Sequence, residues 1–423
     1  MFLVWALAML LAIWAARVAQ IFATKTPKVA SRPVEDFQPR VAVILPIKGV
    51  DDDTADNIRA LLDQDYPHFR LLFAVESPTD PVVGLLEQFA AEDGKGRIEI
   101  VVAGLAQTRG QKVHNQLAAV DRTTARDEVI VFMDADAQPK PNWLYALVNP
   151  LQWDHIGAAT GFRYYIPVQP HTANAIVSVV NAGVAALLGP FRRNFCWGGS
   201  MAIRRKDFFA FVRPDWQNAL SDDYVMSWCV KHRMKSRIKF VPNCLVASMA
   251  NFNWGSFFEF ACRQYRITKV CAIHVWLTAV GGALVYLGSL AYSLGLALYE
   301  TITLKTPPWH QPDPFLLLMF LSLYATSVIR GYYLLAGAKI MLPEHTAALH
   351  KTRFWYTWGY PLTVLMNLMA LLGSAIGRNI MWRNVEYTMV SRTKTLVHRP
   401  ELPKPVSSAT SGEKELAGER VSR

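Results

Sequence analysis

Apolar and amphipathic stretches alternate along residues 41 to 133. Runs of apolar, often branched side chains predict buried strands, and the apolar positions between these runs recur at helical spacing. The strands are expected at residues 41–46, 69–75, 97–102 and 128–133, and the helices at residues 53–63, 80–91 and 112–120. Strands that alternate with helices indicate an α/β fold, in which crossover helices join a mainly parallel sheet.

Longer apolar segments flank this region, at residues 2–23, 273–301, 314–342 and 354–377. A helix needs about 20 such residues to cross a bilayer, so both ends of the chain are expected to enter a membrane. The sequence therefore divides into an N-terminal transmembrane anchor, a polar linker, a domain, C-terminal membrane segments and a polar tail, at residues 1–24, 25–40, 41–270, 271–380 and 381–423 respectively.

The first apolar segment has the charge pattern of a membrane anchor. No charged side chain precedes it, and Lys25, Lys28 and Arg32 follow it. A secretory signal peptide instead has its positive charge before the apolar core. Positively charged flanks stay on the cytosolic side of a membrane, so we expect the N-terminus outside and the domain in the cytosol.

The C-terminal charges conflict with a simple series of spans. The tail is rich in Lys and Arg, and Lys351 and Arg353 precede the last apolar segment, so both flanks of residues 354–377 have a cytosolic pattern. We therefore expect one C-terminal segment to be re-entrant or interfacial, and Pro361 makes the last segment the candidate. Non-helical backbone is tolerated at membrane depth where protein covers it.

Charge and cysteine content narrow the class of protein. The net charge is +11, but the Lys and Arg residues are scattered and follow no nucleic-acid recognition motif. Membrane proteins carry such an excess on their cytosolic flanks, so we expect attraction to anionic lipid and to nucleotide phosphates, and no nucleic-acid partner. The five cysteines show no C-x-x-C spacing, which argues against a disulfide scaffold and a zinc site and fits a reducing compartment.

Asp134 and Asp136 directly follow the predicted strand at 128–133. Two carboxylates at i and i+2, where a buried strand runs into a turn, can reach one divalent cation. A hard cation held by one or two carboxylates keeps coordination positions open for substrate phosphates. Such a pair can also simply cap a turn. The functional interpretation is a Mg²⁺ or Mn²⁺ site that binds a nucleotide diphosphate.

A second acidic cluster, Ser221-Asp222-Asp223, precedes a stretch with helical spacing at residues 225–231. Ser or Asp before a helix is a common N-cap, which explains the cluster without any function. Alternatively, one carboxylate projects into a cleft as a general base and accepts the proton of an attacking hydroxyl. The sequence leaves both interpretations open.

Two further clusters also have two interpretations. Arg263 and Arg266 lie at i and i+3 on one helical face, and they form either a membrane-edge charge patch or the cations that stabilise a departing diphosphate. Gly198 and Gly199, followed by Ser200, allow either a tight turn or the close approach of backbone to a ligand.

In this order the motifs resemble those of the family-2 glycosyltransferases, and within them the ceramide glucosyltransferase-like branch, which includes hopanoid-associated bacterial enzymes. The resemblance covers roughly residues 1–390. The motifs that carry it are residues 45–51, 61–67, 75–81, 134–136, 198–201, 222–224 and 263–266, together with Trp382, Arg383 and Tyr387. It implies a GT-A-type nucleotide-sugar-binding domain on the cytosolic face of a membrane, in bacteria the inner membrane.

The resemblance also implies roles for the donor side of the site. Asp134 and Asp136 match the aspartates that hold the metal and the sugar diphosphate, and Asp80 matches an aspartate near the nucleotide base. Lys48 and Lys112 lie in matching loops and are expected to contact phosphate.

For the acceptor side, Asp223 matches the catalytic base, and Arg263 and Arg266 match polar positions of the (Gln/Arg)-x-x-Arg-Trp signature. The residues expected around the acceptor are Gly198, Gly199, Ser200 and Asp222. Two departures stand out: Ile267 replaces the tryptophan of the signature, and Glu76-Ser77 stands where other members have an aspartate after the second strand.

The predicted function is that of an inverting glycosyltransferase that moves a sugar from a UDP-linked donor to a lipid hydroxyl, on a ceramide- or hopanoid-like acceptor. The apolar residues 175–191 either lie at the membrane interface and admit lipid or form a packed core helix. Two alternatives remain: a processive polysaccharide synthase of the same fold, and a non-catalytic membrane protein that binds nucleotide sugars.

A cysteine introduced in place of Glu415 tests the predicted topology. If one C-terminal segment does not span, the tail shares the cytosolic side with the domain. In sealed inside-out vesicles, a membrane-impermeant maleimide should then label this cysteine, and in right-side-out vesicles it should not. Labelling from the outer face alone would contradict the expectation.

Overall fold

The computed structural model describes residues 2–28, 37–169, 171–303 and 314–399. Its centre is a seven-stranded sheet in the order β3-β2-β1-β4-β6-β5-β7. The four predicted strands form one half of this sheet and pair in parallel, which confirms the α/β expectation. They are β1 (Val41–Pro46), β2 (Phe69–Val75), β3 (Ile98–Val102) and β4 (Val129–Met133).

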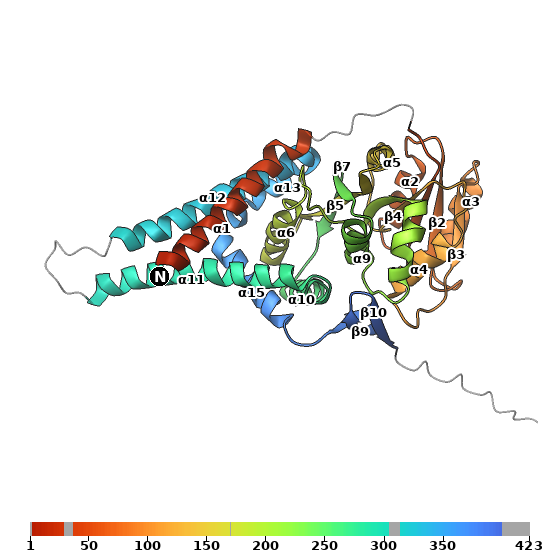
Figure 1. The fold of residues 1–423 in the computed structure, drawn as a ribbon. Helices are drawn as coiled ribbons and strands as arrows, with labels where there is room; N and C mark the ends of the chain where they lie inside the picture. The colour runs from red at the N-terminus through yellow and green to blue at the C-terminus, as the bar shows by residue number, and fades with distance from the viewer. Residues whose placement is uncertain (1, 29–36, 170, 304–313, 400–423) are drawn as a thin grey trace, which may run out of the picture.

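The three predicted helices are also present, as α2 (Thr54–Leu62), α3 (Val82–Glu92) and α4 (Gln111–Val120). They lie against the sheet in Figure 1. In β1, Val43 and Leu45 belong to one apolar core, and Ala42 and Ile44 belong to a second core on the other face of the sheet. Side chains alternate between the two faces of a strand, so a strand buried on both faces is apolar throughout, as the sequence of β1 is.

The other half of the sheet was not predicted. It contains β5 (Ile156–Pro167), β6 (Ser200–Arg204) and β7 (Arg237–Ala250). β6 runs antiparallel to both β4 and β5, and β7 runs parallel to β5. The register between β5 and β7 shifts beside Gly161, where a Cβ atom would lie 2.1 Å from the carbonyl oxygen of Cys244. Glycine at this position allows the irregular strand pairing.

Short helices connect this half of the sheet and cover it. α6 (Thr172–Ala185) packs on β5 and is largely buried, which favours the core-helix interpretation of residues 175–191. The remaining elements are α5 (Trp143–Val148), η2 (Asn149–Gln152), α7 (Arg205–Asp207), η3 (Phe208–Val212), α8 (Arg213–Trp216), α9 (Asp222–Trp228) and η4 (Cys229–Arg233).

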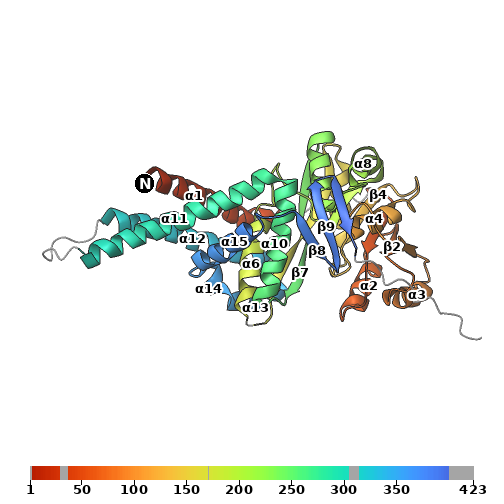
Figure 2. The same cartoon turned by 90° about the horizontal axis from the view of Figure 1, so that it is seen from below.

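Three helices of the described residues are long and apolar enough to cross a membrane: α1 (Phe2–Thr24), α11 (Ile273–Thr303) and α12 (Pro314–Met341). They lie side by side and project away from the α/β domain in both ribbon views (Figures 1 and 2). α10 (Trp254–Cys271) leads from the domain into α11. The N-terminal anchor and two of the predicted C-terminal membrane segments thus form helices of the expected length.

The last apolar segment is broken into two short helices. α14 (Arg353–Tyr356) ends before Gly359, and α15 (Tyr360–Gly373) has 14 residues, fewer than the roughly 20 that a span requires. α15 packs against α10 and α11, and α14 packs against α12; η5 (Pro343–His345) and α13 (Thr346–Lys351) precede them. If α1, α11 and α12 each cross a bilayer, the domain and the residues after α12 lie on the same side of it, as the charge pattern predicts.

The first part of the polar tail is folded. Residues 379 to 398 form a three-stranded antiparallel sheet of β8 (Asn379–Trp382), β9 (Val385–Ser391) and β10 (Lys394–His398). Its apolar face packs against α10 through Ile267 and Cys271, which share a buried cluster with Ile380 and Tyr387. The end of the tail and the middle of the linker, at residues 400–423 and 29–36, lie outside the described residues, and η1 (Thr26–Lys28) begins the linker.

Candidate active site

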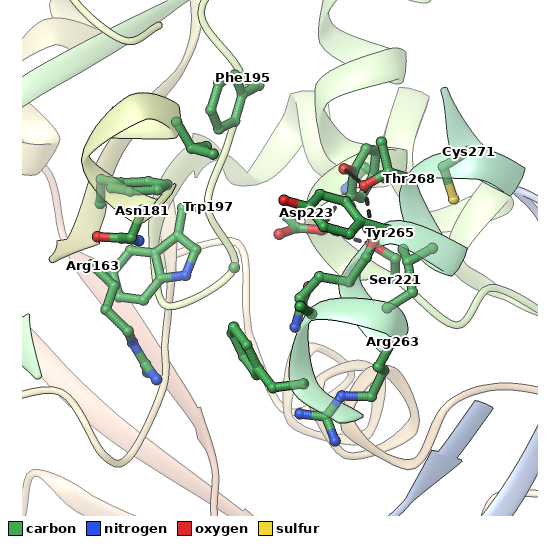
Figure 3. Close-up of a pocket in the computed structure, with 18 of the residues that line it drawn as sticks. Arg163, Asn181, Phe195, Trp197, Ser221, Asp223, Arg263, Tyr265, Thr268 and Cys271 are labelled. Atoms are coloured by element: carbon green, nitrogen blue, oxygen red, sulfur yellow. Dashed lines mark hydrogen bonds between the residues drawn. The ribbon is translucent and has the colours of Figure 1, made fainter. Parts of the chain in front are cut away.

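One cavity of about 2010 Å³ collects most of the residues that the sequence singled out. Asp134 and Asp136 line it from the end of β4, and Asp223 lines it from the start of α9. Figure 3 shows Arg163 and Trp197 on one side of this cavity and Asp223 and Arg263 on the other. The acidic side chains, far apart in the sequence, therefore share one cleft beyond the carboxyl ends of the parallel strands, where ligands bind in open α/β sheets.

Asp134 and Asp136 are held by two cations. Lys112 Nζ lies 2.6 Å from Asp134 Oδ1, while an Nη2 of Arg163 lies 2.6 Å from Asp136 Oδ1 and 3.4 Å from Asp134 Oδ2. Burial alone would raise the pKa of Asp134, but Lys112 and Arg163 outweigh it and hold this pKa below its usual value. Asp134 is therefore ionised at neutral pH, as a metal ligand requires.

The pair fits a cation that substrate phosphates help to coordinate. The Asp136 side chain is 60% exposed and so is free to turn toward a ligand. Within the described residues, no group of three or more His, Cys, Asp or Glu side chains forms a closed metal site. Two carboxylates with open positions are the pattern that Mg²⁺ and similar hard cations use beside phosphates.

Asp223 lies in the first turn of α9, and the N-cap interpretation of its cluster is confirmed. Ser221 is the N-cap of this helix and accepts from Tyr224 N–H. The Ser221 hydroxyl and Tyr224 N–H both donate to Asp223 Oδ1, at 2.6 and 2.7 Å. Burial and the neighbouring Asp222 carboxylate raise the pKa of Asp223 to about 6. A carboxylate with a pKa near neutrality is suited to accept a proton.

Asp222 belongs to the charge network beneath the cleft. It is 5% exposed, its Oδ2 lies 2.9 Å from Lys112 Nζ, and the same oxygen accepts from Gln116 Nε2 at 2.9 Å. Lys112 thus bridges Asp134 and Asp222. Its ammonium makes two ion pairs, which raise its pKa although burial alone would lower it.

The glycine pair lies between the two acidic clusters. A Cβ atom at Gly198 would lie 2.6 Å from Asp222 Oδ2, and one at Gly199 would lie 2.7 Å from Asp134 Oδ2 and 2.2 Å from the Trp197 ring. The glycines therefore let the backbone approach both carboxylates. Ser200 was expected near the acceptor, but it is fully buried in β6, where its hydroxyl accepts from Trp143 Nε1.

The two arginines of α10 separate. Arg263 lines the cavity, and its guanidinium lies 5.7 and 5.9 Å from the ring centroids of Phe260 and Trp382. Arg266 does not line the cavity and instead donates to the backbone carbonyls of Gly373 and Asn379, at 3.5 and 3.2 Å. The expected arginine pair is therefore one cavity residue and one residue that ties α10 to the C-terminal segment, because i and i+3 differ by about 60° around a helix.

The remaining predicted donor residues lie at the sheet edge. Lys48 lines the cavity and forms an ion pair with Glu76 at 3.0 Å. Asp80 does not line the cavity, and its Oδ1 accepts from the N–H groups of Gly49 and Val82, at 2.9 and 3.0 Å. Gly49 has a positive φ of 73°, a backbone conformation that favours glycine. The hydrogen bond from its N–H to Asp80 fixes the turn that carries Lys48.

Several residues that line the cavity were not predicted from the sequence as site residues. Arg163 comes from the unpredicted strand β5, and its guanidinium lies 5.3 Å from the ring centroid of Trp197. From the C-terminal sheet, Arg383 donates to the Lys48 carbonyl at 3.0 Å, and the Tyr387 hydroxyl accepts from Gln111 N–H at 3.4 Å. The only earlier signal for the last two was their place in the motif set that carries the family resemblance.

A family match over nearly the whole chain gives the class of this protein: it is a glycosyltransferase, an enzyme that transfers a sugar from an activated donor. The chain belongs to glycosyltransferase family 21, because the sequence pattern of the family described as "Glycosyl transferase family 21" matches residues 3–395. This match includes the membrane helices and the C-terminal sheet. It confirms the resemblance to ceramide glucosyltransferase-like enzymes.

Individual relatives are distant. Over 63 residues the chain is 36% identical to the ceramide glucosyltransferase of Komagataella phaffii (strain GS115 / ATCC 20864), and this stretch covers 15% of the chain and 12% of that relative. The chain thus matches about an eighth of the relative's length.

Among solved structures, the mannosyltransferase PcManGT from Pyrobaculum calidifontis, in complex with GDP-Man and Mn²⁺, has 18% identity and a TM-score of 0.49. The alignment covers 87% of this chain and 93% of that one. GalNAc-T7 with UDP, GalNAc and Mn²⁺ has 11% identity and a TM-score of 0.40, over 59% of this chain and 51% of that one.

The hydrogen bond from Ser221 to Asp223 predicts a pH shift in Ser221→Ala. The hydroxyl stabilises the charged carboxylate and so lowers the pKa that burial raises, so its removal should raise this pKa further. If Asp223 must be ionised, turnover falls below about pH 6 in the wild type, and the acid limb of kcat should move to higher pH in the variant.

The control is Ser236→Ala, whose hydroxyl donates to Met234 O away from the cavity. Loss of the Ser221 N-cap costs about 1 kcal/mol of stability, so the comparison uses the midpoint of the profile and not the absolute rate. An unchanged acid limb in Ser221→Ala would contradict the role of Asp223.

Proposed function

We propose that this glycosyltransferase moves a sugar from a UDP-linked donor, with inversion at the anomeric carbon, to the hydroxyl of a membrane lipid of ceramide- or hopanoid-like type. The observation that carries the proposal is the extent of the cavity. The same cavity that holds Asp134, Asp136 and Asp223 is also lined by Trp14 of α1 and Tyr286 of α11. A lipid could therefore reach the reacting groups without leaving the bilayer.

The membrane end of the cavity is largely apolar. Its lining comes from α1, α6, α11, α12 and α15, through residues that include Val18, Val180, Ala283, Tyr360 and Val364. Val184 and Leu187, in and after α6, also line it and are 37% and 40% exposed. Such a surface suits the acyl or polycyclic part of a lipid, since burial of apolar area is favourable by about 25 cal/mol per Å².

On the donor side, Asp134 and Asp136 would hold a divalent cation. When bound, this cation supplies positive charge that neutralises the diphosphate of the donor. Lys48 and Arg263 line the same cavity and would bind phosphate oxygens as the leaving group gains charge. The cation–π contact with Trp382 orients the Arg263 guanidinium.

On the acceptor side, Asp223 accepts the proton of the acceptor hydroxyl. A bond forms between that oxygen and the anomeric carbon, the bond from this carbon to the phosphate oxygen breaks, and the nucleotide diphosphate departs with the electron pair. No covalent bond between sugar and enzyme is required. The carboxylate pKa of about 6 keeps Asp223 mostly ionised at pH 7 and still basic enough to help.

The charge pattern supports a cytosolic active site. Lys25 and Lys28 follow α1, and Lys339, Lys351 and Arg353 cluster at and after the end of α12. Positive flanks favour the cytosolic side, where nucleotide sugars are made, and in bacteria this is the inner face of the inner membrane. Anionic lipid head groups at that surface also attract these cations.

Radiolabelled product tests the proposal. The full-length protein in vesicles is given UDP-linked glucose, galactose or N-acetylglucosamine with ceramide or total bacterial lipid. We expect label that partitions into organic solvent. Label retained as a long aqueous polymer would favour a processive synthase, and hydrolysis alone would contradict transfer to a lipid.

Asp223→Asn identifies the base in the same assay. Without a proton acceptor, turnover should fall at least 100-fold, whereas nucleotide binding, measured by tritiated UDP, should stay within about twofold. The control Asp56→Asn alters an exposed carboxylate on α2 that pairs with Arg59. A variant that keeps most of its rate would exclude Asp223 as the base.

Metal removal tests the carboxylate pair. We expect EDTA to abolish transfer and Mn²⁺ or Mg²⁺ to restore it. Asp136→Asn should raise the Mn²⁺ concentration for half-maximal rate about tenfold or more, since it removes a charged ligand. Asp121→Asn, which removes a surface carboxylate paired with Arg213, should leave that concentration unchanged. Full activity in EDTA would contradict the metal site.

A further inference from the structure

Arg330 is a charged residue in the interior of a membrane helix. α12 contains two charged side chains, Arg330 and Lys339, and Lys339 lies near the end of the helix. Arg330 precedes the last residue of α12, Met341, by 11 positions. At 1.5 Å per residue this is roughly 16 Å along the helix, about half the thickness of a bilayer core.

Arg330 lines the same cavity as Asp223. Its guanidinium carbon lies 4.8 Å from the ring centroid of Tyr360 in α15, and that ring lies 5.7 Å from the Tyr286 ring of α11. Gly183 of α6 lies on another side, where a Cβ atom would come within 2.9 Å of Arg330 Nη2. Helices α6, α11, α12 and α15 therefore converge around this one cation.

Within the described part of the chain, Arg330 forms no ion pair, and its Nη1 atom is buried without a hydrogen-bond partner. By contrast, Lys339 in the same helix contacts His350 Nδ1 at 3.1 Å. The guanidinium lies over the Tyr360 ring, and this cation–π contact leaves the Nη1 donor without a hydrogen-bond partner.

An unpaired guanidinium at membrane depth is unfavourable unless something satisfies it. Charged side chains inside a membrane helix are costly and mark binding sites or polar pathways. A buried donor without a partner costs free energy. A ligand that brings an oxygen atom to Arg330 would recover this free energy and would therefore bind in preference to a ligand that does not.

We propose that Arg330 binds an oxygen of the acceptor lipid itself, distinct from the hydroxyl that receives the sugar. This rests on the proposed function, because it assumes that the lipid occupies the cavity with its reactive hydroxyl at Asp223. The lipid class is thereby narrowed to molecules with a second hydrogen-bond-accepting oxygen farther into the bilayer. An amide carbonyl, an ester carbonyl and a phosphate all offer this oxygen.

A panel of lipids with matched chain lengths tests the proposal. All carry a free hydroxyl: ceramide adds an amide, diacylglycerol adds ester carbonyls, phosphatidylglycerol adds a phosphate, and a long-chain alcohol adds nothing. We expect the wild-type enzyme to use at least one of the first three with kcat/KM about tenfold or more above the alcohol. The preferred member identifies the source of the oxygen.

Arg330→Met should remove this preference. Its kcat/KM for the favoured lipid should fall to the value for the alcohol, while its kcat/KM for the alcohol and its KM for the donor remain those of the wild type. A purely structural role would lower the rate with every lipid alike. Lys339→Met, the matched control, removes the other cation of α12, which does not line the cavity, and should keep the preference.

Gly183→Ala gives a second test that keeps the charge. The added methyl group displaces the Nη2 end of Arg330, and we expect a smaller loss of preference in the same direction. If Arg330→Met fails to fold, this variant and the wild-type panel still decide the matter. Equal use of the alcohol and the other lipids by the wild type overturns the inference alone, whereas no transfer to any lipid overturns the proposed function as well.

Discussion

The site depends on one buried ammonium group. Lys112 Nζ lies 2.6 Å from Asp134 and 2.9 Å from Asp222, and so joins the end of β4 to the start of α9. Both carboxylates lie close to the Gly198-Gly199 backbone, and without the cation between them they would repel each other in a medium that screens charge poorly. Removing one partner of such a buried group typically costs about 3–5 kcal/mol.

The four carboxylates at the cavity, Asp134, Asp136, Asp222 and Asp223, differ in their charged neighbours. Asp134 and Asp222 share Lys112, and Asp136 pairs with Arg163, so each of these three carboxylates contacts a cationic side chain. Asp223 receives a hydroxyl and a backbone N–H, and beside Asp222 its pKa rises to about 6. Among the ion pairs of the described residues, none involves Asp223, which lines the same cavity as residues of the membrane helices.

Local patterns determine how far the sequence could be interpreted. β1 to β4 were predicted because a strand buried on both faces is a continuous apolar run. β5 was missed because glycine and Arg163 interrupt its apolar pattern. The sequence analysis therefore also missed Arg163 as the cation that pairs with Asp136. Arg266 and Ser200 were assigned to the site from their neighbours in sequence, but helix rotation and strand alternation turn both side chains away. Contacts between distant segments decide such orientations.

The C-terminal sheet has a consequence for biosynthesis. Arg383 and Tyr387 bind the backbone of Lys48 and Gln111, which were made more than 270 residues earlier. A ribosome must therefore translate, and the translocon must release, α11 and α12 before these contacts can form. The catalytic domain is synthesised early, but its cavity lacks the Arg383 and Tyr387 side chains until the chain is nearly finished.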